Sequence, residues 1–271
     1  MNIWTRWVRQ PQTLWLRKAV FQVHLWTGVG VGFYTLLISL TGSVLVYRNE
    51  LYRAATPKPV MVRPSGARLS EDGLKAAAAH AYPEYAVFSI SHESSPNEAV
   101  TIALRRGNEY KSRLFDPYTG ADLGDAVPLG ILLVSRLLSL HDDLFAGSTG
   151  RSVNGIAALT LIVMASTGLV VWWPGIGSWR RSLVVRRHVG WRRLAWDLHS
   201  AIGFWTFFVI LMFGISGAYL GNPETFQDFA DRLQPPTAAN AGFRLVDSII
   251  YWLAYLHFGR ICGIGIPCKG P

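Results

Sequence analysis

Four of the chain's seven histidines lie at the ends of apolar stretches. His24 and His199 each begin an uncharged run, whereas His141 and His257 each lie near the end of an apolar segment. Histidine is a common axial ligand of haem iron, and a haem held between two helices needs one imidazole from each. We therefore interpret these residues as two candidate haem-ligand pairs, His24 with His199 and His141 with His257.

The positions of two glycines support haem binding by the first of these pairs. Gly28 follows His24 by four residues, and Gly203 follows His199 by the same number. Residues four apart share one face of a helix, so each glycine would leave room for a flat macrocycle beside its histidine. The aromatic side chains expected nearby are Trp26, Phe33, Phe204 and Trp205. The basic side chains expected to neutralise haem propionates are Arg17, Lys18, Arg192 and Arg193.

A second matched spacing further along the chain indicates an internal repeat. Gly42 and Gly217 lie 18 residues after His24 and His199, and each follows a hydroxyl residue, in Thr41-Gly42 and Ser216-Gly217. A third dipeptide of this kind is Thr167-Gly168. Because small residues let membrane helices approach closely, we interpret the first and third apolar runs as duplicated, closely packed halves.

Other roles for these side chains were weighed against haem. A single histidine at a membrane edge is more often an interfacial anchor or a hydrogen-bonded core residue, so the haem interpretation depends on the pairing. Copper or zinc is an alternative, but neither pair is accompanied by a carboxylate or thiolate set. Cys262 and Cys268 lack zinc-ligand spacing and the Cys-x-x-Cys-His motif. The remaining histidines lie in polar sequence and are expected at the surface: His80, His92 and His188.

The segments that carry these histidines are predicted to cross a membrane. Charged residues make up 16% of the chain, against about 25% in a typical soluble domain. Three runs contain no Asp, Glu, Lys or Arg: 19–47, 152–179 and 198–223. A helix of about 20 apolar residues spans the hydrocarbon core, where an ionised group is costly. We predict three full transmembrane helices in the lipid bilayer, the first an uncleaved signal-anchor.

The charges of the connecting segments predict the orientation. Residues 1–18 carry four cations and no acid, and residues 175–197 carry six arginines and one acid. Basic short loops stay in the cytoplasm, so the N-terminus is expected inside and residues 50–150 and 221–249 outside. Because the net charge of +9 is concentrated beside the spans, nucleic-acid binding is not expected.

The segment between the first two spans predicts a small α+β domain. Ser70 can cap a helix that continues to about Tyr82. Alternating apolar residues over 100–104 predict a strand, and a turn at 106–108 leads into a second strand over 110–115. The apolar helix over 129–145 is too short and too charged at its end to span, so we expect it in the outer interface. The predicted fold class is an all-α membrane bundle with this α+β domain inserted.

The motifs together resemble the PepSY-associated transmembrane family, which includes the bacterial inner-membrane ferric-siderophore reductases. The resemblance covers nearly the whole chain, with the motifs in the family's order. The matching segments are 24–28 and 40–45, 116–120, 140–145, 166–169 with 172–174, 197–199 with Gly203, and 256–259.

The resemblance implies a helical bundle in the bacterial inner membrane with a periplasmic PepSY domain. It implies one or two b-type haems with His24, His199, His141 and His257 as axial ligands, and an oxidoreductase activity that passes electrons to a ferric siderophore. The haem does the chemistry, so no catalytic side chain is expected. The electron donor, cytoplasmic or quinol, is left open.

These predictions give one plan for the chain. It consists of a cytoplasmic N-terminus (1–18), a transmembrane helix (19–47), a periplasmic PepSY-like domain (50–128), an interfacial helix (129–145), a second transmembrane helix (152–174), a cytoplasmic loop (175–197), a third transmembrane helix (198–221) and a periplasmic segment with an incomplete fourth helix (222–271).

The last part of the chain departs from the family pattern, which continues into a fourth span. Here 12 uncharged residues separate Asp247 from Arg260. We therefore expect an incomplete fourth helix and, because His257 lies on it, an outer haem site that is weaker than the inner one.

Two other functions fit the sequence. A non-enzymatic, membrane-anchored PepSY module that binds a protease or cell-envelope partner would use residues 82–120 and need neither His24 nor His199. The second of these functions is that of an accessory subunit of a transporter. A visible absorption spectrum separates the haem protein from both.

Overall fold

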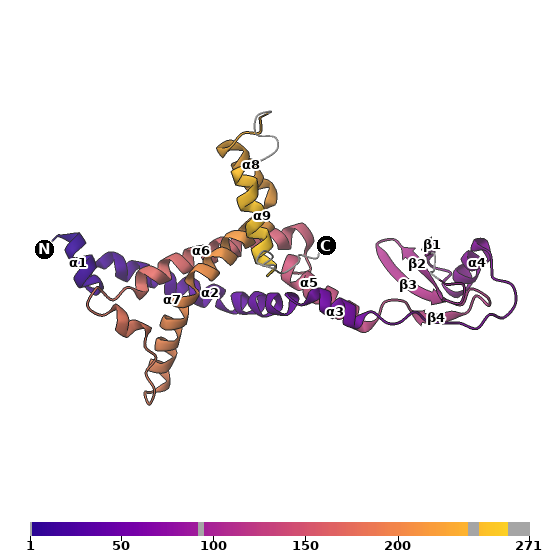
Figure 1. Ribbon diagram of the computed structural model, residues 1–271, viewed down its shortest axis with the longest axis horizontal. Helices are drawn as coiled ribbons and strands as arrows, with labels where there is room; N and C mark the ends of the chain where they lie inside the picture. The colour runs from indigo at the N-terminus through magenta and orange to yellow at the C-terminus, as the bar shows by residue number, and fades with distance from the viewer. Residues whose placement is uncertain (1, 92–94, 238–243, 260–271) are drawn as a thin grey trace, which may run out of the picture. The chain divides into compact units, whose positions relative to one another are not determined.

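The protein divides into two compact units. The computed structural model describes residues 2–91, 95–237 and 244–259 (Figure 1). We call the unit formed by Met1–Val46 and Leu138–Pro271 the helical bundle, and the unit Tyr47–Leu137 the sheet domain. The expectations for His92, Cys262, Cys268 and the segment from Arg260 onward concern residues outside the described ranges.

Three helices of the bundle are long and apolar enough to cross a membrane: α2 (Trp15–Leu45), α6 (Gly147–Trp172) and α7 (Trp191–Gly221). Helix α6 packs against both α2 and α7. Many large apolar side chains of these helices face outward, as expected for helices surrounded by lipid. The chain is therefore a multi-pass membrane protein, as the sequence predicts. Helices α2 and α7 begin before the uncharged runs, because long basic side chains at a helix end can reach the membrane interface.

Glycines bring α6 and α7 into direct backbone contact. A Cβ atom on Gly221 would lie 2.5 Å from Cα of Gly155, and a Cβ atom on Gly214 would lie 2.8 Å from the side chain of Ile162. Any larger residue at either position would push the helices apart. This contact fixes which residues of α7 face α6.

Shorter helices flank the spans. A hydrogen bond from Trp173 Nε1 to the carbonyl of Trp7 (3.2 Å) joins the end of α6 to the N-terminal segment. Arg244 joins α8 to α9 through ion pairs to Asp231 and Asp247, both at 2.6 Å. Helix α9 packs against α7. The short elements are α1 (Ile3–Arg9), the 3-10 helices Pro11–Thr13 and Trp179–Leu183, α5 (Leu129–Asp143), α8 (Pro223–Leu233) and α9 (Leu245–His257).

The sheet domain contains one four-stranded antiparallel sheet in the order β1-β2-β3-β4. The strands are β1 (Ala86–Ile90), β2 (Val100–Arg106), β3 (Glu109–Phe115) and β4 (Asp122–Asp125), and the helices are α3 (Arg48–Ala55) and α4 (Glu71–Ala81). Helix α4 begins as predicted, with the Ser70 hydroxyl accepting a hydrogen bond from the amide of Gly73 (3.2 Å). The predicted fold class is thus confirmed.

The two outer strands of the sheet were not predicted. Strand β1 has a register shift between Val87 and Ser89, which breaks the alternation that marks a strand in a sequence. Strand β4 has only four residues, too few for a periodic pattern to be recognised.

The core of the sheet domain lies between α4 and the inner face of the sheet. Its fully buried side chains include Ile102, Leu104 and Phe115. We expect Phe115→Ala to lower the free energy of unfolding of this domain by about 3–5 kcal/mol, because it leaves a cavity. Amide hydrogen exchange in the full-length protein should show faster exchange across β2 and β3. Phe88→Ala is the control, since Phe88 is 59% exposed and its loss should cost about 1 kcal/mol or less. Equal effects of the two changes would contradict the assigned core.

Candidate functional site

The four membrane-edge histidines lie in two pairs. The ring centres of His24 on α2 and His199 on α7 are 6.2 Å apart. Those of His141 on α5 and His257 on α9 are 6.5 Å apart. The two other described histidines, His80 and His188, are exposed and belong to neither pair. We call the first pair the inner pair and the second the outer pair.

The separation of the rings matches the distance that two axial ligands of one metal require. An imidazole nitrogen lies about 1.1 Å from its ring centre and about 2.0 Å from a bound metal, so two opposed axial imidazoles have ring centres about 6 Å apart. The ring centres of both pairs are about this far apart. Among the described residues, no group of three or more His, Cys, Asp or Glu side chains could hold a metal ion. Two imidazoles are the axial ligand set of a group that brings its own equatorial ligands, as haem does.

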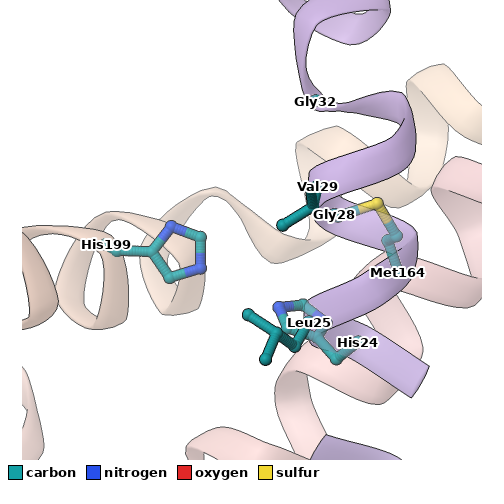
Figure 2. A pocket seen from close by; sticks show the side chains of 7 residues that line it. All are labelled: His24, Leu25, Gly28, Val29, Gly32, Met164 and His199. Carbon is teal, nitrogen blue, oxygen red and sulfur yellow. The ribbon is translucent and has the colours of Figure 1, made fainter. Parts of the chain in front are cut away.

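A pocket of about 340 Å³ adjoins the inner pair. Figure 2 shows His199 pointing from α7 across this space toward α2. The lining residues are His24, Leu25, Gly28, Val29, Gly32, Met164 and His199, so Gly28 belongs to the pocket as expected, whereas Gly203 is not part of the lining. A Cβ atom on Gly203 would meet no atom within 4 Å. The aromatic residues expected nearby do not line the pocket either, and Phe204 instead stacks on Trp172 with ring centres 4.2 Å apart.

His141 is held in place by two spans. Nδ1 of His141 lies 3.1 Å from the hydroxyl of Thr41 and 3.1 Å from the carbonyl oxygen of Ile38, both on α2. Asn154 of α6 donates to the carbonyl of His141 (2.8 Å) and so fixes the end of α5. Burial lowers the pKa of His141, which favours the neutral imidazole that a metal requires.

A strained turn follows His141. Leu144 and Phe145 both adopt the left-handed conformation, with φ of 53° and 61°. The Asp143 carboxylate supports the turn by accepting a hydrogen bond from the amide of Phe145 (3.0 Å). Residues other than glycine adopt this conformation at a cost of about 1–2 kcal/mol each. Such a conformation persists where the surrounding structure requires it, and here the chain reverses sharply between α5 and α6.

His257 is held mainly by α7. Nδ1 of His257 lies 2.8 Å from the hydroxyl of Ser216, and its ring contacts Phe213 edge-on with centres 5.4 Å apart. Ser216 itself is fully buried. The expectation that the outer site is the weaker stays a prediction.

Three hydroxyl-glycine dipeptides contact histidines, which the sequence analysis did not foresee. Thr167 lies 3.2 Å from Nδ1 of His24, in the same way as Thr41 contacts His141 and Ser216 contacts His257. In the sequence these dipeptides form a repeat, and their glycines are typical of helix-packing sites. The repeated hydroxyl before each glycine was the signal that could have pointed to a histidine partner.

The basic residues that precede His24 and His199 in the chain differ in their contacts. Arg193 and Arg186 pair with the buried carboxylate of Asp197, at 3.0 and 3.5 Å. Arg17 donates to the carbonyl of Val171 (2.5 Å), and its Nε is buried with no hydrogen-bond partner among the described residues. Arg17 therefore keeps a donor with no partner among the described residues, whereas Arg193 is paired.

Comparison with known proteins agrees with the fold and the membrane spans. A family model described as "PepSY-associated TM region" matches residues 21–242. The chain is also 33% identical over 88 residues to "Uncharacterized protein PA4219" of Pseudomonas aeruginosa, a match that covers 31% of this chain and 21% of that protein. The match thus spans about a fifth of the relative's length. Because the family model covers most of the chain, this protein belongs to the PepSY-associated transmembrane family.

Proposed function

We propose that this protein binds b-type haem at its two histidine pairs and passes electrons across the bacterial inner membrane to ferric-siderophore iron. The observation that carries this proposal is the separation of ring centres, 6.2 Å and 6.5 Å, in two pairs built from different helices. A chance meeting of two histidines is common, but two pairs at one spacing favour one kind of ligand.

The position of the pairs along the bundle supports transport of electrons across a membrane. His24 and Thr41, the partner of His141, both lie on α2. At about 1.5 Å of rise per residue they are about 25 Å apart along the helix axis. The hydrocarbon core is about 30 Å thick, so each pair would lie near one of its faces.

The residues of the chain would bind and orient the cofactor. The four histidines would supply the axial nitrogens, and Gly28 would leave space beside the inner pair. Arg17 could neutralise a propionate. Haem, when bound, supplies a reversible one-electron couple that no side chain provides. The ferric siderophore as acceptor, and a cytoplasmic or quinol donor, follow from the family resemblance and not from the geometry.

A visible spectrum tests this proposal directly. We expect protein purified in detergent from haem-replete cells to show a Soret band and, after dithionite, the α and β bands of low-spin haem b. Pyridine haemochrome analysis against protein concentration gives the stoichiometry. A colourless preparation would overturn the proposal and favour the membrane-anchored PepSY module or the transporter subunit.

The proposed direction of electron transfer requires the sheet domain to lie in the periplasm. The loop 175–197 is strongly basic, whereas the segment between α2 and α6 has balanced charge, which favours this orientation. We expect a reporter that is active only in the cytoplasm to be silent when fused after Gly107. The same reporter fused after Gly177 should be active. The opposite pattern would place the pair His24 and His199 on the outer side.

A further inference from the structure

Three of the four paired histidines contact a hydroxyl in the same way. Nδ1 of His24, His141 and His257 lies 3.2, 3.1 and 2.8 Å from the hydroxyl oxygens of Thr167, Thr41 and Ser216. We propose that these three hydroxyls are positioning residues: each accepts a hydrogen bond from Nδ1–H and so leaves Nε2 unprotonated and free to bind a metal. This inference rests on the proposed haem function.

The carbonyl to which each hydroxyl donates its hydrogen indicates which group is the donor in the contact with histidine. A hydroxyl has one hydrogen and two lone pairs. Thr167 donates to the carbonyl of Val163 (2.7 Å), one helical turn earlier. Ser216 donates to the carbonyl of Met212 (2.8 Å), and Thr41 to that of Leu37 (3.0 Å). With its hydrogen directed to the helical carbonyl, each oxygen offers the imidazole a lone pair.

A second contact assigns the proton of His141 independently. The carbonyl oxygen of Ile38 lies 3.1 Å from Nδ1 of His141. A carbonyl cannot donate, so a hydrogen bond here requires the hydrogen on Nδ1. The two acceptors around this nitrogen, Ile38 and Thr41, agree on the same tautomer.

The glycine after two of the three hydroxyls lies close to the imidazole. A Cβ atom on Gly42 would lie 2.8 Å from Cε1 of His141, and one on Gly168 would lie 3.1 Å from Cε1 of His24. A side chain at Gly42 would displace the ring of His141, and one at Gly168 would crowd the ring of His24. At Gly217 the distance to Cε1 of His257 is 3.9 Å, which is ordinary contact. In Thr41-Gly42 and Thr167-Gly168 the dipeptide thus combines an acceptor with the space that the ring needs.

The chemical consequence concerns the strength of the metal bond. A metal binds only the unprotonated ring nitrogen, and which nitrogen that is depends on the hydrogen bond made by the other. Such a bond also fixes the ring orientation and raises the basicity of the ligand. No hydrogen bond to the ring of His199 is found within the described ranges, so the inner pair has one fixed and one less constrained ligand. Loss of the Thr167 hydroxyl should therefore act through His24.

The test compares Thr167→Val, which removes the hydroxyl at nearly constant volume, with Thr167→Ser, which keeps it. We expect Thr167→Val to weaken binding of the inner haem about 10- to 100-fold, as is typical when the partner of a metal-ligating histidine is lost. The remaining inner haem should have a more positive midpoint potential and altered low-spin electron paramagnetic resonance g-values. Thr167→Ser should restore all three properties.

A matched control separates positioning from helix stability. Thr160 lies on the same helix and its hydroxyl donates to the carbonyl of Ile156 (3.0 Å). Thr160→Val should change neither the potential nor the g-values. If Thr167→Val keeps the wild-type potential, g-values and haem content, or if Thr160→Val changes them equally, the proposal is wrong. Should Thr167→Val not be recovered as folded protein, Ser216→Ala with Ser216→Thr as its rescue gives the same test at His257.

A second measurement does not depend on haem. Nitrogen-15 spectra of the histidine side chains in the full-length protein, in lipid nanodiscs, distinguish the two neutral tautomers. We expect the proton on Nδ1 for His24, His141 and His257, and a change for His24 alone in Thr167→Val. Protons on Nε2 in the wild type would overturn this inference even if haem is present. A colourless protein with protons on Nδ1 would overturn the haem function but leave the tautomer assignment standing.

Discussion

Replacing either His24 or His199 with Ala is expected to remove one and the same haem. Each imidazole would supply one axial bond, and a haem with a single ligand in an open pocket is held weakly. The two variants should therefore lose the same spectral component and the same fraction of haem relative to the parent protein. His141→Ala and His257→Ala should both lose the other component.

The double variant His24→Ala/His199→Ala makes this test quantitative. Residues that act as one unit give non-additive effects, so the double variant should lose no more haem than either single one. His188→Ala is the control, because His188 is exposed and belongs to neither pair. Different haems lost from the two single variants, or additive losses, would show that His24 and His199 do not share a ligand. Measurement is by pyridine haemochrome content and reduced-minus-oxidised difference spectra.

Gly221→Val is expected to disrupt the bundle itself. The first added atom would lie 2.5 Å from Cα of Gly155 and 2.9 Å from the carbonyl oxygen of Arg151. Both are backbone atoms, so α6 and α7 must separate, at a cost of about 3 kcal/mol or more. We expect a large loss of folded protein in a detergent-denaturation titration. Haem should be lost from both pairs, because α7 carries His199 and the Ser216 partner of His257.

Gly30→Val is the matched control for this substitution. Gly30 also lies within a span, on α2, but a Cβ atom there would meet no atom within 4 Å. Its replacement should leave the denaturation midpoint nearly unchanged, since valine lowers helix stability no more than glycine does. Similar losses in both variants would mean that glycine is needed in the spans for a reason other than the α6–α7 contact.

The sequence determined the membrane spans and the general plan of the sheet domain. Whether a helix can lie in lipid depends on its own side chains, because each buried charge is costly regardless of the neighbouring helices. The uncharged runs therefore predicted α2, α6 and α7. Local chemistry also sufficed for the Ser70 cap of α4, since a cap involves residues three apart. Elements with weak local signals, such as β1 with its irregular register and the short β4, were missed.

The details of the site depended on how the helices pack. The sequence named Gly28 and Gly203 beside the histidines; Gly28 lines the pocket and Gly203 does not. Gly42 and Gly168 lie nearest to histidine rings, each on a helix other than that of its histidine.

Only the tertiary structure could pair each hydroxyl with its histidine. Thr167 and His24 are separated by 143 residues along the chain, and their contact depends on how α2 and α6 are rotated against each other. In the same way, the backbone contact between Gly155 and Gly221 fixes the rotation of α7 against α6. This rotation directs Ser216 toward α9. A helix sequence specifies which residues share a face, but the partner of that face is decided by close packing between helices, which no local pattern encodes.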